Sequence, residues 1–182
     1  MGGKFSFKLG SSDRLRALPG KIIIGQNSIE TDTHVLLKLV AYIYFFRERV
    51  QLEPSLHLDS IPYVPDVFQM DYEMRPKLWV ECGECSVEKL DRLAVKAPEA
   101  ELWVVKRSAA EVQELRQAMA KEDLRRDRYG LVGLEPEMID EMCGLLRGRN
   151  ELFWVGAEPD PPVMQFDFNG LWFEMPFTVL RF

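Results

Sequence analysis

Residues 65–89 read PDVFQMDYEMRPKLWVECGECSVEK, which is two acidic strands followed by the start of a helix. Within them, residues 77–82 alternate as in a half-buried strand. Glu81 is a carboxylate near the C-terminal end of this otherwise apolar strand. A charge placed there is costly to desolvate unless it has a cation, a proton or a donor. Asp66 at the start of the preceding strand, and Lys89 on the next helix, would complete a site for a divalent metal and a phosphate.

The predicted site uses side chains that suit metal-assisted phosphodiester chemistry. Mg²⁺ (or Mn²⁺) prefers hard oxygen ligands and binds through one or two carboxylates plus substrate phosphates. Such an ion lowers the pKa of a water and stabilises charge on the phosphate. Asp66 and Glu81 would be the metal ligands, Lys89 would orient the water or the leaving oxygen, and Glu30 is a further acid at a helix start. The alternative is that these are solvated charges on a strand face.

Asp71 is a rival for the aspartate position. If the two strands join around Pro76, Asp71 lies across from Glu81 in a regular antiparallel ladder. Asp66 would then lie roughly 16 Å further along, at about 3.3 Å per residue. Only a bulge, a bend or an offset pairing would bring Asp66 to Glu81.

A second candidate site is the C-x-x-C pair formed by Cys82 and Cys85, between a strand and a helix N-terminus. The helix dipole and free amides there would lower a thiol pKa, as redox dithiols need. This pattern predicts a thiol redox protein, and the alternative is a pair of buried or incidental cysteines.

The length, net charge and apolar runs of the chain limit the class of protein. At 182 residues, we expect one domain spanning residues 1–182. The net charge of −6 argues against general nucleic-acid affinity and leaves only a local basic patch. No apolar run reaches the roughly 20 residues of a transmembrane helix, and the start lacks the apolar core of a signal peptide. We therefore expect a cytoplasmic protein with no membrane partner.

The N-terminal part predicts a hairpin followed by a long helix. Residues 4–8 and 21–24 are strand-like and flank a polar loop. Asn27 and Ser28 offer an N-cap for an apolar helix over residues 30–49. In this helix Glu30, His34 and Lys38 form one polar stripe, which either faces solvent or lines a cleft.

The rest of the chain alternates strands with helices and ends in strands. The pair Asn169-Gly170 is a strong hairpin signal. Ser86, Ser108 and Pro136 mark the starts of three helices. The alternation predicts an α/β fold, a mixed sheet flanked by helices with hairpins at both chain ends. The expected strands are 56–58, 67–73, 77–82, 101–106, 129–134, 152–155, 163–168 and 171–173, and the expected helices are 86–97, 109–121 and 137–146. An aromatic C-terminus (Phe166, Phe168, Trp172, Phe173, Phe177 and Phe182) is either core or a partner interface.

Several of these segments together resemble the YaeQ family of small, largely uncharacterised bacterial proteins. They are Glu30-Thr31 with the helix LLKLVAY, the segment RERVQL at 47–52, PDVF at 65–68 and LWVECG at 78–83. The family is regarded as a variant of the PD-(D/E)XK nuclease-like superfamily, which implies a restriction-endonuclease-like core.

The resemblance implies Asp66 and Glu81, rather than Asp71, as the metal carboxylates, and Glu30 as the acid of the first helix. The superfamily lysine two residues after the glutamate is replaced here by Gly83, so Lys89 is the candidate for its role. The resemblance disfavours the redox interpretation. It leaves two functions open, a metal-dependent nuclease acting on or binding nucleic acid, and a catalytically silent module that binds a protein partner.

Overall fold

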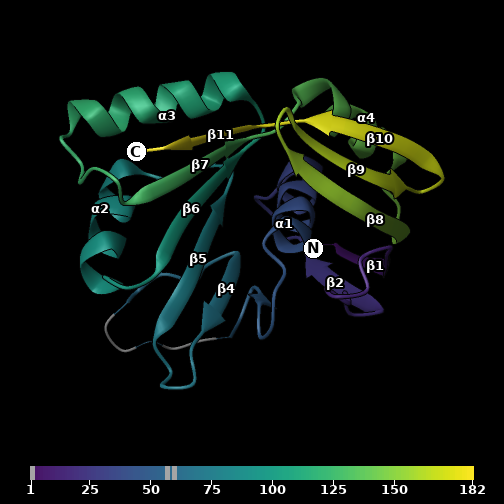
Figure 1. Ribbon diagram of the computed structural model, residues 1–182, viewed down its shortest axis with the longest axis horizontal. Coiled ribbons are helices and arrows are strands. Elements are labelled where there is room, and N and C mark those ends of the chain that lie inside the picture. The colour runs from purple at the N-terminus through teal and green to yellow at the C-terminus, as the bar shows by residue number, and fades with distance from the viewer. Residues whose placement is uncertain (1–2, 56–57, 59–60) are drawn as a thin grey trace.

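The computed structural model in Figure 1 describes residues 3–55, 58 and 61–182. Over these residues the chain is an α/β protein with two mixed β-sheets and four helices. The expectation of one mixed sheet was wrong, because a further strand joins the two terminal hairpins into a sheet of their own. The strand expected at 56–58 falls mostly outside the described residues.

The five-stranded sheet joins the two ends of the chain in the order β10-β9-β8-β1-β2. Strands β1 (Lys4–Ser11) and β2 (Lys21–Gly25) form the first predicted hairpin. Strands β9 (Pro162–Phe168) and β10 (Leu171–Pro176) form the second, which turns at Asn169 and Gly170 with φ of 52° and 85°. The hairpins are connected through β8 (Arg149–Pro159), which runs parallel to β1. Both terminal hairpins are confirmed.

The six-stranded sheet has the order β11-β7-β6-β5-β4-β3. Its parallel centre is β5 (Pro76–Cys82), β6 (Glu101–Lys106) and β7 (Tyr129–Gly133), linked by helical crossovers as the alternating pattern predicts. Antiparallel strands complete both edges: β4 (Val67–Met70) and the short β3 (Gln51–Leu52) on one side, and β11 (Thr178–Arg181) on the other. At the centre, Trp103 lies so close to Gly130 that a Cβ at Gly130 would stand 2.2 Å from the indole ring.

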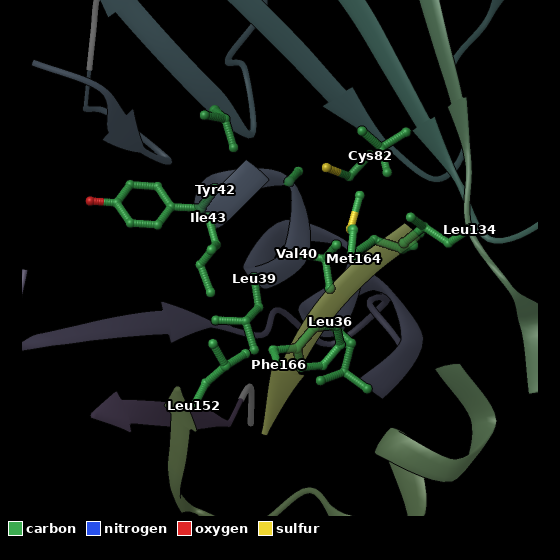
Figure 2. Packing of buried hydrophobic residues seen from close by; sticks show 14 of the residues in the cluster. Leu36, Leu39, Val40, Tyr42, Ile43, Cys82, Leu134, Leu152, Met164 and Phe166 are labelled. Carbon is green, nitrogen blue, oxygen red and sulfur yellow. The ribbon is translucent and has the colours of Figure 1, made fainter. Parts of the chain in front are cut away.

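Helix α1 (Asp32–Tyr44) lies between the two sheets (Figure 1). This position explains its apolar content, because one face packs on the six-stranded sheet and the other on the five-stranded sheet. Figure 2 shows Leu36, Leu39 and Val40 of α1 beside Met164 and Phe166. The main core therefore has α1 at its centre.

Helix α1 is shorter than the expected 30–49. Its N-cap is Thr31, whose Oγ1 accepts a hydrogen bond from His34 N at 3.3 Å. The expected cap at Asn27 was wrong, because the Asn27 side chain accepts from Ile29 N at 3.0 Å and closes a turn before the helix. The helix ends at the C-cap Phe45, before Arg49 takes a left-handed φ of 66°.

The other three helices match their expected positions. Helices α2 (Val87–Lys96) and α3 (Ala109–Lys121) begin after the N-caps Ser86 and Ser108 and cover the second face of the six-stranded sheet, where a second core cluster lies. Helix α4 (Pro136–Leu145) begins with Pro136 and packs against α1. No helix in the described part of the chain is long and apolar enough to cross a membrane.

Candidate functional site

The predicted carboxylates lie at one end of the β4–β5 pair. In this pair Val67 is opposite Val80, and the Asp66 N–H donates to Val80 O at 3.1 Å. Continuing this register by one residue places Asp66 across from Glu81. The register that paired Asp71 with Glu81 was wrong, because the chain turns through residues 71–75 and a bulge at Gln69 and Met70 shifts the pairing.

Asp71 holds that turn together at the other end of the strands. Its Oδ1 accepts hydrogen bonds from Glu73 N and Arg75 N, and its Oδ2 binds the Arg75 guanidinium at 2.9 Å. The bond from the Arg75 amide is the largest cause that lowers the pKa of Asp71, and together with the Arg75 guanidinium and the Glu73 amide it outweighs the opposing effect of burial. Asp71 therefore has a structural role in the turn.

Glu81 points to the α2 side of the six-stranded sheet. Its side chain is 5% exposed, and both oxygens have partners. The Trp79 indole N–H donates to Oε1 at 2.7 Å, and the Lys89 ammonium binds Oε2 at 2.7 Å. Burial raises the pKa of Glu81, and the charge of Lys89 opposes that rise without cancelling it. The structure thus brings Glu81 and Lys89 together.

The Asp66 carboxylate turns the other way, towards α1. Its Oδ2 accepts from Cys82 N at 2.7 Å. Its Oδ1 lies 3.5 Å from His34 Nε2 and 3.9 Å from Lys38 Nζ. Asp66 and Glu81 therefore sit at neighbouring strand ends, but each carboxylate has its partners on a different helix.

The polar stripe of α1 is buried in this site. Lys38 is 1% exposed, and its ammonium lies 2.5 Å from Glu30 Oε1 and 2.5 Å from Glu53 Oε1. We call Glu30, His34, Lys38, Glu53 and Asp66 the Lys38 cluster. The interpretation of the stripe as a solvated helix edge was wrong, because Lys38 is buried, and the alternative that the stripe lines a cleft stays a prediction.

Hydrogen bonds keep the Lys38 cluster charged. Burial acts to lower the pKa of Lys38, but the bonds to Glu30 and Glu53 outweigh it and raise that pKa. Burial likewise acts to raise the pKa of Glu30, and the bonds from Lys38 and from the Asn27 amide lower it overall. Lys38 and Glu30 therefore form an ammonium and a carboxylate in direct contact.

Sequence reasoning missed Glu53 altogether. It follows the two-residue strand β3, its N–H donates to Asp66 O at 2.9 Å, and its backbone is left-handed with φ of 43°. No periodic pattern marks such a residue. His34 and Lys38, by contrast, were visible as the polar stripe on an apolar helix.

The residues present match Mg²⁺ in donor chemistry. Glu30, Glu53, Asp66 and Glu81 supply the hard oxygens that this ion prefers. His34 Nε2 is buried between Glu30 and Asp66 with no hydrogen-bond partner among the described residues. The Lys38 ammonium touches the oxygens as a bound cation would. As they stand, however, no three His, Cys, Asp or Glu side chains of the described chain are arranged around one metal position.

The cysteine pair lacks the thiol chemistry predicted for it. Cys82 is 1% exposed, and burial raises the pKa of its thiol well above the ordinary value. Burial together with the charge of Glu81 raises the pKa of the Cys85 thiol to about 12. The expectation of a lowered thiol pKa was wrong, because burial and neighbouring carboxylates outweigh the helix N-terminus.

The aromatic C-terminus is mainly core. Five of its six rings are at most 8% exposed, and Trp172 is 50% exposed. Phe166 stacks on Phe173 with ring centroids 5.4 Å apart. Four of the rings belong to the core around α1 and Phe182 belongs to the second core cluster, so the alternative of an aromatic partner surface fails for all but Trp172.

Comparisons with known proteins agree on one family. The sequence model of the YaeQ protein family matches residues 3–154. The crystal structure of YaeQ protein from Pseudomonas syringae is 15% identical with a TM-score of 0.75, covering 100% of this chain and 96% of that one. The YaeQ protein from Xanthomonas axonopodis pv. citri is 17% identical with a TM-score of 0.71, covering 99% and 97%. At these identities the solved structures show a shared fold. No curated protein matches the chain.

Proposed function

This chain belongs to the YaeQ family, and from that premise we propose that it is a metal-dependent, nuclease-like protein that acts on or binds nucleic-acid phosphodiesters. In this proposal β4 to β7, with α1 on one face and α2 and α3 on the other, form a restriction-endonuclease-like core. Asp66 and Glu81 are its metal carboxylates. Lys89 takes the role of the lysine that the superfamily carries two residues after the glutamate.

One observation carries the proposal, the register of β4 and β5. It places Asp66, and not Asp71, at the strand end beside Glu81. The Lys89 ammonium then lies 2.7 Å from Glu81 although it comes from the following helix. Two acids and a lysine that the resemblance in sequence singled out thus lie at one end of one strand pair, with the two carboxylates turned towards different helices.

The position and hydrogen-bond partners of each residue determine the role that we propose for it. Mg²⁺, when bound, would lower the pKa of a water and stabilise charge on a phosphate. Glu81, fixed by Trp79, and Asp66, fixed by the Cys82 amide, would hold it. Lys89 would orient a water or a leaving oxygen, and Glu30 would close the α1 side of the site.

Calorimetric titration of Mn²⁺ tests the metal site. We expect the wild type to bind and Asp66→Ala and Glu81→Ala to lose binding. Asp71→Ala is the matched control, since it removes a carboxylate at the far end of the same strands and should keep binding. Cleavage of single- and double-stranded DNA and RNA with Mg²⁺ is then measured for the same four proteins. Cleavage that survives in Glu81→Ala would contradict the assigned roles.

The second candidate is a catalytically silent module that presents its surface to a protein partner. The observation in its favour is that Glu81 is already paired with Lys89, and Glu30 and Glu53 with Lys38. Absence of both Mn²⁺ binding and cleavage in the wild type would select this candidate.

A further inference from the structure

Lys38 is a buried cation held by three acids from three separate segments. Its ammonium lies 2.5 Å from Glu30, 2.5 Å from Glu53 and 3.9 Å from Asp66, and the side chain is 1% exposed. Glu30 precedes α1, Glu53 follows β3 and Asp66 precedes β4. A cation surrounded by carboxylate oxygens of distant segments is also how proteins hold hard metal ions.

The charges within the Lys38 cluster do not balance. Its three carboxylates and one ammonium alone sum to −3 + 1 = −2. His34 Nε2 lies 3.7 Å from Glu30 and 3.5 Å from Asp66 and makes no hydrogen bond within the described residues. The cluster therefore carries excess negative charge and a ring nitrogen without a partner among the described residues, so it could bind a more highly charged cation than a single ammonium.

We propose that Lys38 is a tethered internal cation that competes with the divalent metal for Glu30 and Asp66, so that metal enters only as the ammonium moves away. The proposal rests on the site assigned above and adds its regulation. One amine cannot occupy the same oxygens as a metal ion, because both are positive and need the same lone pairs. The wild-type site is then a low-affinity site, kept closed by its own lysine until the metal displaces the ammonium.

Glu53 gives the displaced ammonium a partner. Its side chain is 32% exposed, against 11% for Glu30 and 16% for Asp66. Lys38 has a flexible four-carbon stem. It can therefore stay bound to the outer acid while releasing the two inner ones to the metal.

Titration of Mn²⁺ into Lys38→Met tests the competition. Methionine keeps a long apolar stem and removes the charge, so we expect Mn²⁺ to bind at least about ten-fold more tightly than in the wild type. Lys77→Met is the matched control, because it removes one positive charge from the other end of β5, where Lys77 lies 3.9 Å from Glu99. It should bind Mn²⁺ as the wild type does.

The outcomes separate this inference from the proposed function. Tight Mn²⁺ binding by Lys38→Met without cleavage of nucleic acid would support the competition between Lys38 and the metal and would contradict the proposed nuclease activity. Equal affinities of the wild type and Lys38→Met would overturn the competition and leave the metal site intact. Absence of binding in a folded Lys38→Met would overturn the competition outright.

Reductive methylation of the wild-type protein gives a test that needs no variant at Lys38. A side chain that is 1% exposed should be modified slowly. If metal displaces the ammonium, saturating Mn²⁺ should speed methylation of Lys38 several-fold and leave Lys77 unchanged, as read by mass spectrometry of peptides. Methylation of Lys38 that Mn²⁺ leaves unchanged would overturn the proposal.

Discussion

Lys89 and Glu81 form an ion pair of 2.7 Å that links the first turn of α2 to the end of β5, and the Glu81 side chain is 5% exposed. Removing the cation in Lys89→Met leaves Glu81 buried with only the Trp79 N–H as donor. We expect a loss near the lower end of the about 3–5 kcal/mol typical of broken buried pairs, because Lys89 itself is 22% exposed. Urea unfolding at neutral pH measures the loss.

The pH dependence of this loss identifies its origin. Burial already raises the pKa of Glu81 above its ordinary 4.5, and loss of Lys89 raises it further. A carboxyl group whose pKa is raised by folding favours the native state when it is protonated. The deficit in stability of Lys89→Met should therefore be small at low pH. It should grow as the pH rises from the folded-state pKa of Glu81 in the wild type towards the higher pKa in the variant. The double variant Lys89→Met/Glu81→Gln should regain most of the stability at pH 7. A deficit independent of pH would mean that packing of the lysine stem, and not charge, was lost.

Much of the fold follows from local signals in the sequence. Ser86, Ser108 and Pro136 mark three helix starts correctly because a serine N-cap or a proline at the first helical position acts on the turn beside it. The Asn169-Gly170 turn is equally local. The two-sheet arrangement was not predicted, because it depends on β1 pairing with β8, residues more than 140 positions apart. Such a pairing leaves no periodic trace in either segment.

In the candidate site, too, residues with a local signal were predicted and residues placed by long-range contacts were not. Glu81 and the stripe of α1 stand out as charges on apolar elements, and Lys89 as a basic residue on the helix that follows Glu81. Asp66 and Asp71 could not be ranked from spacing, since a bulge and a five-residue turn change the register by several positions. Glu53 was missed because only the fold brings the end of β3 beside Lys38.

Leu39 tests the position of α1 as the centre of the core. It is 0% exposed and lies between the sheets (Figure 2). We expect Leu39→Ala to lower the free energy of unfolding by about 2–5 kcal/mol, because the deletion leaves a cavity that both sheets resist filling. Val95→Ala on α2 is the control: Val95 is 52% exposed, and its loss should stay within about 0.5 kcal/mol. Similar losses in the two variants would argue against a shared core around α1.

Two glycines differ in backbone conformation but not in available space. A Cβ at Gly170 or at Gly156 would meet no atom within 4 Å, yet only Gly170 has a left-handed φ, 85°. We expect Gly170→Ala to cost about 1–2 kcal/mol, the penalty of an L-residue in this region. Gly156→Ala should be neutral or slightly stabilising, because alanine restricts the unfolded chain. Thermal unfolding of both variants measures the difference, and equal midpoints would contradict the hairpin geometry.

Cys85 tests whether the cysteine pair has redox chemistry. With a thiol pKa of about 12, roughly one molecule in ten thousand carries the thiolate at pH 8, against about a quarter for an ordinary cysteine of pKa about 8.5. We expect iodoacetamide to alkylate Cys85 in the native protein about a thousand-fold more slowly than in the urea-unfolded chain. Mass spectrometry of peptides at timed intervals gives both rates. Because a redox dithiol must present a thiolate, native alkylation as fast as in the unfolded chain would restore the thiol mechanism that burial otherwise argues against.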